Sequence, residues 1–400
     1  MRQSKLILPI VVTSQFCCTS LWFAGNGVMS ELIVNFNLKA SALGHLTSAV
    51  QFGFILGTLI FAIFTISDRF SPSKVFLSCA LLGAIFNVGV IWEGNNLASI
   101  LSLRFITGFF LAGIYPVGMK IAADYYEKGL GKSLGFLVGA LVVGTAFPHL
   151  VKVMTEAFPW KFVFLFTSTI AIIGGILMLI MVPDGPYRKS GNKLNISAFF
   201  GVFRNRKFRS AAFGYFGHMW ELYAFWAFVP IILKTYSLEH PEVTFNIPLL
   251  SFMIIGIGGL ACILGGYLAQ RAGTKRIASI VLILSCGCCL VSSLFFMTQS
   301  ETLFIGFLIF WGMVVIADSP LFSTLVAQNA SGEIKGTALT IVNCVGFSIT
   351  IISIQLLNVL QDLMNPKYIY TVLAIGPILG LIALLERKKL HPTKPKLHRL

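Results

Sequence analysis

The chain has 400 residues, of which 56% are hydrophobic and only 11% are charged, and its mean hydropathy is +0.85. A soluble globular protein carries about a quarter charged residues because its surface must stay hydrated. The composition therefore excludes a soluble domain and predicts an integral membrane protein. The net charge of +15 does not indicate a nucleic-acid-binding protein, because the basic residues lie in short runs between apolar stretches.

A helix that crosses a bilayer needs roughly 20 mostly apolar residues, and the sequence contains twelve such windows. They lie near 7–34, 42–66, 75–93, 98–123, 131–154, 161–183, 210–233, 247–269, 277–297, 302–328, 336–360 and 367–386. The long polar interval from Asp184 to Arg209 divides them into two groups of six. We therefore predict one six-helix bundle over 1–183, a linker over 184–209, a second bundle over 210–386 and a basic tail over 387–400.

The first apolar stretch predicts a membrane span and not a signal peptide. It follows Arg2 and Lys5 and runs to about Phe36, which is too long for a signal peptide's apolar region, and no small-residue cleavage pattern ends it. The 8 cysteines all lie within apolar runs, as small packing residues do. The segment Cys286–Cys289 has no accompanying group of His or Cys, so we expect no metal and no cofactor.

The distribution of Lys and Arg predicts the orientation of the spans. The N-terminus, alternate loops, the linker and the C-terminal tail together hold 23 of these residues, whereas the opposite side holds 5. The last two of the 30, Arg104 and Lys120, lie within a span. By the positive-inside rule, we expect both termini and the linker in the cytoplasm, and an even number of spans across the inner or plasma membrane.

The two groups of six spans share a repeat. Arg69 follows span 2, and Arg271 follows span 8, 202 residues later. Tyr115-Pro116 in span 4 corresponds to Ser319-Pro320 in span 10, at an offset of 204. Repeated halves at a steady spacing are typical of secondary transporters, whose substrate site lies between the halves.

The loops that follow spans 2 and 8 carry a motif that resembles the major facilitator superfamily. The family pattern is Gly-x-x-x-Asp-Arg-x-Gly-Arg-Lys, which is associated with gating between conformations. The matching residues here are Asp68, Arg69, Lys74, Gly266, Arg271, Gly273, Lys275 and Arg276. Phe64 and Ser71 replace both glycines in the first loop, and Gln270 replaces the acid in the second.

Two further segments resemble the same family. Arg104 to Gly108, with Gly113 and Pro116, is similar to its span-4 motif, and Gly135 to Pro148 is similar to its glycine-rich span 5. Ser20–Asn26 together with His218–Tyr223 resembles a branch near cyanate- and nitrate-type permeases. The resemblance covers nearly the whole chain. It implies an all-α fold of twelve helices in two pseudo-symmetric six-helix bundles, alternating access, and a part for Arg104 in proton coupling.

Ionisable side chains inside a membrane are costly, so each is a functional candidate. Glu221 lies near the middle of span 7, and His218 precedes it by one helical turn on the same face. Because burial penalises a bare charge, a carboxyl group there can take up and release a proton, which makes Glu221 the leading proton carrier. The alternative is a structural acid that ties span 7 to a neighbouring helix.

The remaining intramembrane ionisable groups leave their roles open. Asp318 precedes a proline that bends span 10, so a hinge contact competes with proton or substrate contact. Arg104 is a candidate for coupling and for substrate binding. Lys120 either faces the cavity or extends to the interface, and His149 is either a substrate ligand or a hydrogen-bonded core residue.

Uncharged polar and aromatic side chains in the spans complete the candidate substrate cavity, although each could equally pack against lipid or another helix. With Arg104 and His149, the cavity candidates are Trp22, Asn26, Gln51, Tyr115, Trp220, Tyr223, Trp226 and Asn343.

The sequence therefore predicts a secondary active transporter that works by alternating access, with protons as the coupling ion. The intramembrane side chains are more basic than acidic, which favours a small anionic or zwitterionic solute. The partners are this solute, protons and membrane lipids, without nucleic acid, and we expect a monomer. Multidrug efflux by proton antiport is the alternative. A membrane enzyme would need a cluster of catalytic groups that the spacing does not show. No Walker-type phosphate loop is present, and no filter motif indicates a channel.

The charge asymmetry predicts a topology that cysteine labelling can check. In a background without the native cysteines, single cysteines placed in 184–209 and in 387–400 should react only with reagents that reach the cytoplasm. Labelling of either segment from outside would overturn both the orientation and the even number of spans.

Overall fold

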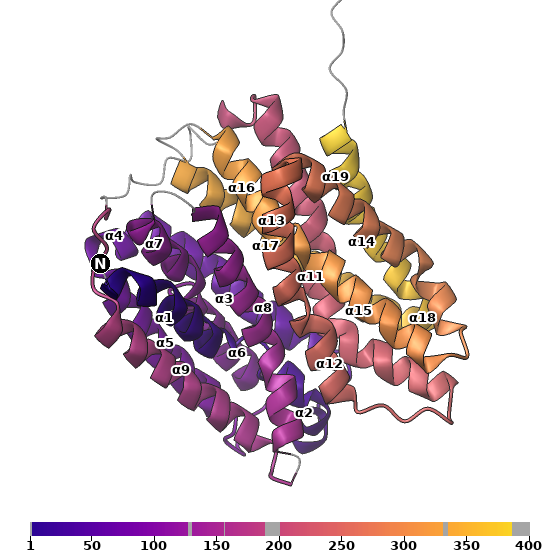
Figure 1. The fold of residues 1–400 in the computed structure, drawn as a ribbon. Coiled ribbons are helices and arrows are strands. Elements are labelled where there is room, and N and C mark those ends of the chain that lie inside the picture. Colours follow the sequence, from indigo (N-terminus) through magenta and orange to yellow (C-terminus); the bar gives the residue numbers. More distant parts are fainter. Residues whose placement is uncertain (1, 127–129, 156, 189–200, 331–334, 386–400) are drawn as a thin grey trace, which may run out of the picture.

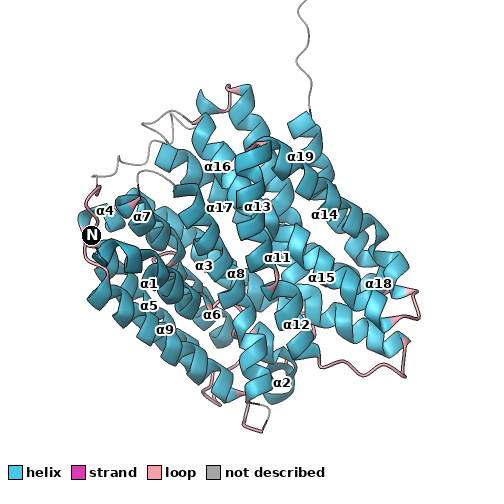
Figure 2. Cartoon of the chain, viewed as in Figure 1, coloured by secondary structure: helices cyan, strands magenta, loops and turns pink. Residues whose placement is uncertain are grey.

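The computed structural model describes residues 2–126, 130–155, 157–188, 201–330 and 335–385. These residues form helices joined by short loops, and no strand occurs among them (Figure 2). Within the described residues, 11 helices are long and apolar enough to cross a membrane, and a shorter apolar helix covers Leu6–Thr19. The predicted all-α membrane fold is therefore confirmed.

The first half of the chain contains the helices drawn from indigo to magenta in Figure 1. They are α1 (Arg2–Thr19), the short η1 (Asn26–Val28), α2 (Met29–Asn35), α3 (Ala42–Ile63), α4 (Ile66–Arg69), α5 (Pro72–Gly89), α6 (Leu97–Leu111), α7 (Tyr115–Tyr125), α8 (Leu130–Met154) and α9 (Lys161–Met181).

The second half lies beside the first and is drawn from pink to yellow (Figure 1). Its helices are α11 (Arg206–Glu239), α12 (Ile247–Gly256), α13 (Gly258–Ala272), α14 (Thr274–Phe296), α15 (Glu301–Ala317), α16 (Ser319–Asn329), α17 (Lys335–Leu363), α18 (Pro366–Ile369), η3 (Tyr370–Ala374) and α19 (Ile375–Leu385). We call the end of the molecule that holds residues 64–71, 182–188 and 272–274 the linker end, and the opposite end the far end.

The first span differs from its prediction as one helix over 7–34. Helix α1 ends at Thr19, turns occupy 20–25, and η1 and α2 follow. At the break, Arg104 binds the carbonyls of Leu21 and Trp22, and further on η1 packs closely on α8, because a Cβ atom at Gly27 would lie 3.0 Å from the backbone of Pro148. A glycine at this position lets η1 lie against α8.

Spans 4 and 10 are interrupted at matching places in the repeat. Helix α6 gives way to α7 just before Tyr115-Pro116, and α15 gives way to α16 at Asp318, just before Ser319-Pro320. Proline has no N–H to donate and clashes with the preceding turn, which favours a break at these two places, although α1, α8 and α11 continue through Pro9, Pro148 and Pro230. Spans 4 and 10 are therefore jointed at matching places in the two halves.

Glycines allow neighbouring helices to approach within backbone contact. On α3, a Cβ atom at Gly53 would overlap the Phe105 carbonyl of α6, and one at Gly108 of α6 would overlap the Val50 carbonyl of α3. Between the two halves, a Cβ atom at Gly139 on α8 would lie 3.2 Å from the Gly259 carbonyl on α13. In a bilayer such close packing replaces the hydrophobic effect as the force that holds helices together.

The two halves meet along a seam that we define by two helix pairs, α3 with α17 and α8 with α12 and α13. Near the far end, Gln355 of α17 donates to the Gly44 carbonyl at 3.0 Å and to Ser48 Oγ at 2.8 Å on α3. Asn358 donates to the Ser41 carbonyl at 3.0 Å, and Thr350 donates to Gln51. We call these contacts the hydrogen-bond ladder.

The α3–α6 contact predicts a sharp difference between glycines. Gly53→Ala and Gly108→Ala should each destabilise the protein by about 1–3 kcal/mol, because the added methyl group meets backbone that cannot move away cheaply. Gly287→Ala and Gly306→Ala are the controls, since no atom lies within 4 Å of a Cβ at either position. Thermal unfolding in detergent measures the effect, and equal melting temperatures for all four variants would contradict this packing.

Candidate functional site

Five aromatic side chains gather at the seam, and we call them the aromatic cluster. Trp22 follows α1, Phe54 belongs to α3, Tyr223 and Trp226 belong to α11, and Phe347 belongs to α17. The rings of Trp22 and Tyr223 stack at 5.7 Å with 27° between their planes. Phe347 lies 5.8 Å from Trp22 and 5.2 Å from Tyr223. All five are buried, so both halves contribute to one closed aromatic contact.

Two polar atoms in this cluster have no partner. The indole N–H groups of Trp22 and Trp226 are buried and donate to no acceptor among the described residues. Leaving a buried donor unpaired costs about 1–3 kcal/mol, so such groups are rare in well-packed cores. Their presence at the meeting point of the two halves indicates a place where a ligand with acceptor atoms can bind.

Arg104 supports the backbone of Trp22. Its Nη2 donates to the carbonyl of Leu21 at 2.9 Å and to the carbonyl of Trp22 at 2.5 Å, and its Nη1 donates to Asn87 Oδ1 at 2.7 Å. The turn after α1 frees these carbonyls from helical hydrogen bonds, and a guanidinium group is well suited to bind them. Arg104 is therefore a positioning residue for Trp22.

The charge of Arg104 is not balanced locally. Its partners are two carbonyls and an amide, and no carboxylate of the described residues forms an ion pair with it. Asn26, another cavity candidate, donates to Thr47 Oγ1 at 2.9 Å and ties η1 to α3. The Arg104 guanidinium group thus places a positive charge next to the backbone of Trp22, and its hydrogen bonds fix the position of that charge.

Two tyrosines extend the cluster toward the linker end. Tyr115 begins α7 in the first half, and Tyr215 lies two turns before Tyr223 on α11. Tyr115 is half-buried and Tyr215 is buried, and the Tyr215 ring packs against the position of Gly346 on α17.

His218 and Asp318 form a buried pair in the second half. His218 Nδ1 lies 2.8 Å from Asp318 Oδ1, and both side chains are 1% exposed. Asp318 stands at the junction of α15 and α16, so the pair joins α11 to the joint of the tenth span. The ring of Tyr215 lies 6.0 Å from the imidazole, which places the pair beside the seam.

Glu221 points into the second half and away from the aromatic cluster. Its Oε1 accepts hydrogen bonds from Ser285 Oγ and Trp311 Nε1, each at 2.6 Å. These donors come from α14 and α15. The sequence places Glu221 and His218 on one face of the helix, but it cannot show that they meet different partners. The only sequence feature that could have indicated a hydrogen-bond donor for Glu221 is a tryptophan deep in a span, such as Trp311.

Other predicted cavity residues are dispersed. Gln51 belongs to the hydrogen-bond ladder, and Trp220 donates to the Val372 carbonyl at 3.3 Å on the side of η3, away from the aromatic cluster. His149 is buried on α8, and its Nε2 has no partner among the described residues. Asn343 is half-buried on α17.

At the linker end, Asp68 from the loop motif pairs with Lys120. Lys120 Nζ lies 2.7 Å from Asp68 Oδ1 and 3.7 Å from Asp124 Oδ1, so it forms ion pairs within the first half. Arg188 donates to the carbonyls of Asp68 and Phe70 and holds the start of the linker against this loop. These contacts join the loop after span 2 to span 4.

The other residues of the loop motifs make fewer contacts. Arg69 Nε donates to Thr65 Oγ1 at 3.2 Å. Gly273 has a φ of 92°, which a residue with a side chain adopts only with strain, and it ends α13. Gly266 has open space at its Cβ position. The side chains of the remaining members, Lys74, Arg271, Lys275 and Arg276, are exposed.

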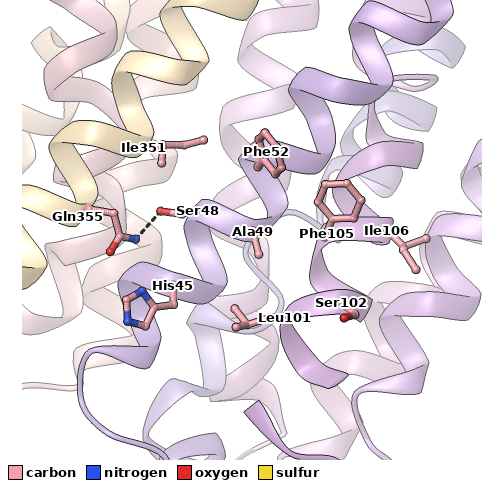
Figure 3. Close-up of a pocket in the computed structure, with 10 residues that line it drawn as sticks. All are labelled: His45, Ser48, Ala49, Phe52, Leu101, Ser102, Phe105, Ile106, Ile351 and Gln355. Atoms are coloured by element: carbon pink, nitrogen blue, oxygen red, sulfur yellow. Dashed lines mark hydrogen bonds between the residues drawn. The ribbon is translucent and has the colours of Figure 1, made fainter. Parts of the chain in front are cut away.

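A lateral groove of about 700 Å³ lies between α3, α6 and α17 (Figure 3). Its lining residues are His45, Ser48, Ala49, Phe52, Leu101, Ser102, Phe105, Ile106, Ile351 and Gln355. The groove runs beside the hydrogen-bond ladder, and the Gln355–Ser48 contact is drawn in Figure 3. Its lining contains none of the intramembrane acids, so we separate it from the candidate site.

Among the described residues, no group of three or more His, Cys, Asp or Glu is arranged to hold a metal ion. The arrangement instead offers aromatic faces, unpaired N–H donors, a fixed cation and a buried His–Asp pair around a seam between two halves. Such a site can bind a small molecule and a proton.

Comparison with known proteins supports this description. The family model for the Major Facilitator Superfamily matches residues 11–354. AraJ of Escherichia coli is 24% identical over 78% of this chain and 77% of its own length. The niacin transporter NiaP of Acinetobacter baylyi is 27% identical over 45% of this chain and 43% of its own length. The galacturonate transporter of Dickeya chrysanthemi is 24% identical over 47% of this chain and 59% of its own length.

Solved structures agree on the fold. The proton:xylose symporter XylE superposes with a TM-score of 0.73 at 15% identity, and the match covers 95% of each chain. At this level of identity the similarity shows the fold alone.

Proposed function

The chain belongs to the Major Facilitator Superfamily, and from that membership we propose that it is a proton-coupled transporter of a small organic anion. It is a multi-pass membrane protein and a solute transporter, and its relatives are transporters and not enzymes. The observation that carries the proposal is the seam: both halves supply side chains to one buried aromatic cluster, with a buried ionisable pair beside it.

The seam gives the transport cycle its geometry. The hydrogen-bond ladder joins α3 to α17 near the far end, so opening toward that side requires these contacts to break. Hydrogen bonds between membrane helices average only about 0.6 kcal/mol each, so a few of them can be broken by the energy of a bound ligand. Following the excess of Lys and Arg at the linker end, we assign that end to the cytoplasm.

Charge favours an anion as the solute. Arg104 places an unbalanced cation behind Trp22, and both unpaired indole groups are donors. The acids of the second half are engaged elsewhere, Glu221 by Ser285 and Trp311, and Asp318 by His218. Niacin and galacturonate, which name the substrates of two relatives, are both organic acids and agree with this expectation.

We assign the proton to the His218–Asp318 pair and not to Glu221. The imidazole and the carboxyl group of this pair can together gain or lose one proton. Because Asp318 stands at a joint, movement of α15 relative to α16 can change the distance between Nδ1 and Oδ1. Glu221 is held by two donors from neighbouring helices, which is the geometry of a structural acid.

The assignment predicts opposite outcomes for two acids. Asp318→Asn should abolish accumulation driven by a pH gradient, because the pair can no longer release its proton, while exchange of labelled for unlabelled solute persists. Glu221→Gln should keep accumulation and lower stability by about 1 kcal/mol, because the amide oxygen can still accept both hydrogen bonds that Oε1 receives, but more weakly than a carboxylate does.

The measurement uses reconstituted vesicles and an acid chosen by thermal shift from nicotinate, benzoate and galacturonate, since a bound ligand raises the melting temperature. Accumulation that survives Asp318→Asn but is lost in Glu221→Gln would move the proton to Glu221. Failure of every organic anion to enter under a pH gradient would reject the proposed function as a whole.

A further inference from the structure

We propose that the aromatic cluster selects a planar aromatic monocarboxylate, with the ring of the substrate inserted between Trp22 and Tyr223. This inference rests on the proposed transport of an organic anion and names the class of anion. It starts from the observation that two stacked rings belong to opposite halves of the molecule.

The stacked rings of Trp22 and Tyr223 can separate when the two halves move, and a substrate ring can then take the space between them. Trp22 belongs to the first half and Tyr223 to the second, so any movement that parts the halves also parts the two ring faces. Exposed ring faces are unfavourable unless another flat, apolar surface replaces the lost contact. A planar ring fits between two faces and restores stacking on both sides, whereas a puckered ring touches them at only a few atoms.

The unpaired donors suit the carboxylate of such a molecule. Trp22 Nε1 and Trp226 Nε1 are buried, come from opposite halves and have no acceptor among the described residues. A carboxylate has two oxygens that accept hydrogen bonds, and charge makes these bonds shorter and stronger than neutral ones. The substrate thereby satisfies donors that the protein leaves unpaired.

The charge behind the cluster favours one negative group and disfavours a cation. The Arg104 guanidinium group binds the Trp22 carbonyl directly, so its field acts on the same side of the cluster. Aromatic cages can bind cations when the cation is not opposed by a like charge. Here the nearby fixed charge is positive, and Glu221 and Asp318 are held by partners within the second half.

The walls of the cluster exclude a polyhydroxylated acid. Phe54, Phe347 and the indole faces offer no partners for ring hydroxyl groups, and nearby Gln51 offers only its unpaired Nε2, since its Oε1 accepts from Thr350. Each hydroxyl group buried without a partner lowers affinity by roughly tenfold or more. A sugar acid with several hydroxyl groups therefore binds far more weakly than a benzoate-like molecule of the same charge.

The test compares three probes of equal charge with the purified full-length protein. Benzoate is planar, cyclohexanecarboxylate has the same number of carbons but a puckered ring, and galacturonate carries hydroxyl groups. We expect benzoate to bind at least about tenfold more tightly than either of the others by isothermal titration calorimetry, and to quench tryptophan fluorescence as it stacks.

Variants then separate the contribution of the stacking faces from that of the indole N–H donor. Trp22→Phe keeps a flat face but removes the N–H group, and should weaken benzoate about tenfold while leaving the preference for benzoate over cyclohexanecarboxylate. Tyr223→Leu should remove that preference, and Tyr223→Phe should keep it. Trp220→Phe, which removes an indole N–H on the same helix but outside the cluster, is the control and should bind benzoate as the unchanged protein does.

The outcomes distinguish this inference from the proposed function. If galacturonate binds and is accumulated while benzoate is not, the aromatic selectivity is overturned and anion transport stands. If a lipophilic cation binds and no organic anion does, both are overturned. A Trp22→Phe protein that melts normally and binds benzoate with unchanged affinity would also reject the carboxylate–indole contact.

Discussion

A polar group inside a bilayer has no water to bind, and this constraint governs the placement of the buried polar groups. Several of these groups have partners within their own half of the chain. The carbonyls freed by the break after α1 bind Arg104, and Glu221 binds Ser285 and Trp311. At the seam the constraint is not met, because the indole donors of the aromatic cluster have no acceptors. The chain thus leaves unpaired indole donors where its two halves meet, and a solute that supplies acceptors there can contribute binding energy.

The two jointed helices connect this surface to movement. The joints lie at matching positions of the repeat, before Pro116 and at Asp318, and Tyr115 and His218 lie at or against them. A change in the angle of either joint moves side chains that border the aromatic cluster. Under the proposed function, solute at the cluster and a proton on the His218–Asp318 pair would both bias these joints, and a shared bias of this kind is what couples two sites.

The sequence is sufficient to predict the helices and their division into two groups, because apolar windows and the repeat can be recognised without knowing which helices touch. It also identifies His218, Glu221 and Asp318 as a group, since intramembrane acids are rare. It does not predict that α1 ends at Thr19, because the carbonyls freed there are bound by Arg104, far along the chain. It favours Glu221 over Asp318 as the proton carrier and does not find the Asp68 partner of Lys120, because helical periodicity gives the face of a residue but not the neighbouring helix.

Alternating access requires the two halves to close at one end of the seam while they open at the other, and paired spin labels test this most directly. One pair, at Lys39 and Leu363, spans the seam at the far end, and a second pair, at Lys74 and Lys275, spans the linker end. Distances measured by double electron–electron resonance, in protein without native cysteines, should change in opposite directions when pH or the bound organic anion changes. Two distances that stay fixed, or that lengthen and shorten together, would contradict the account.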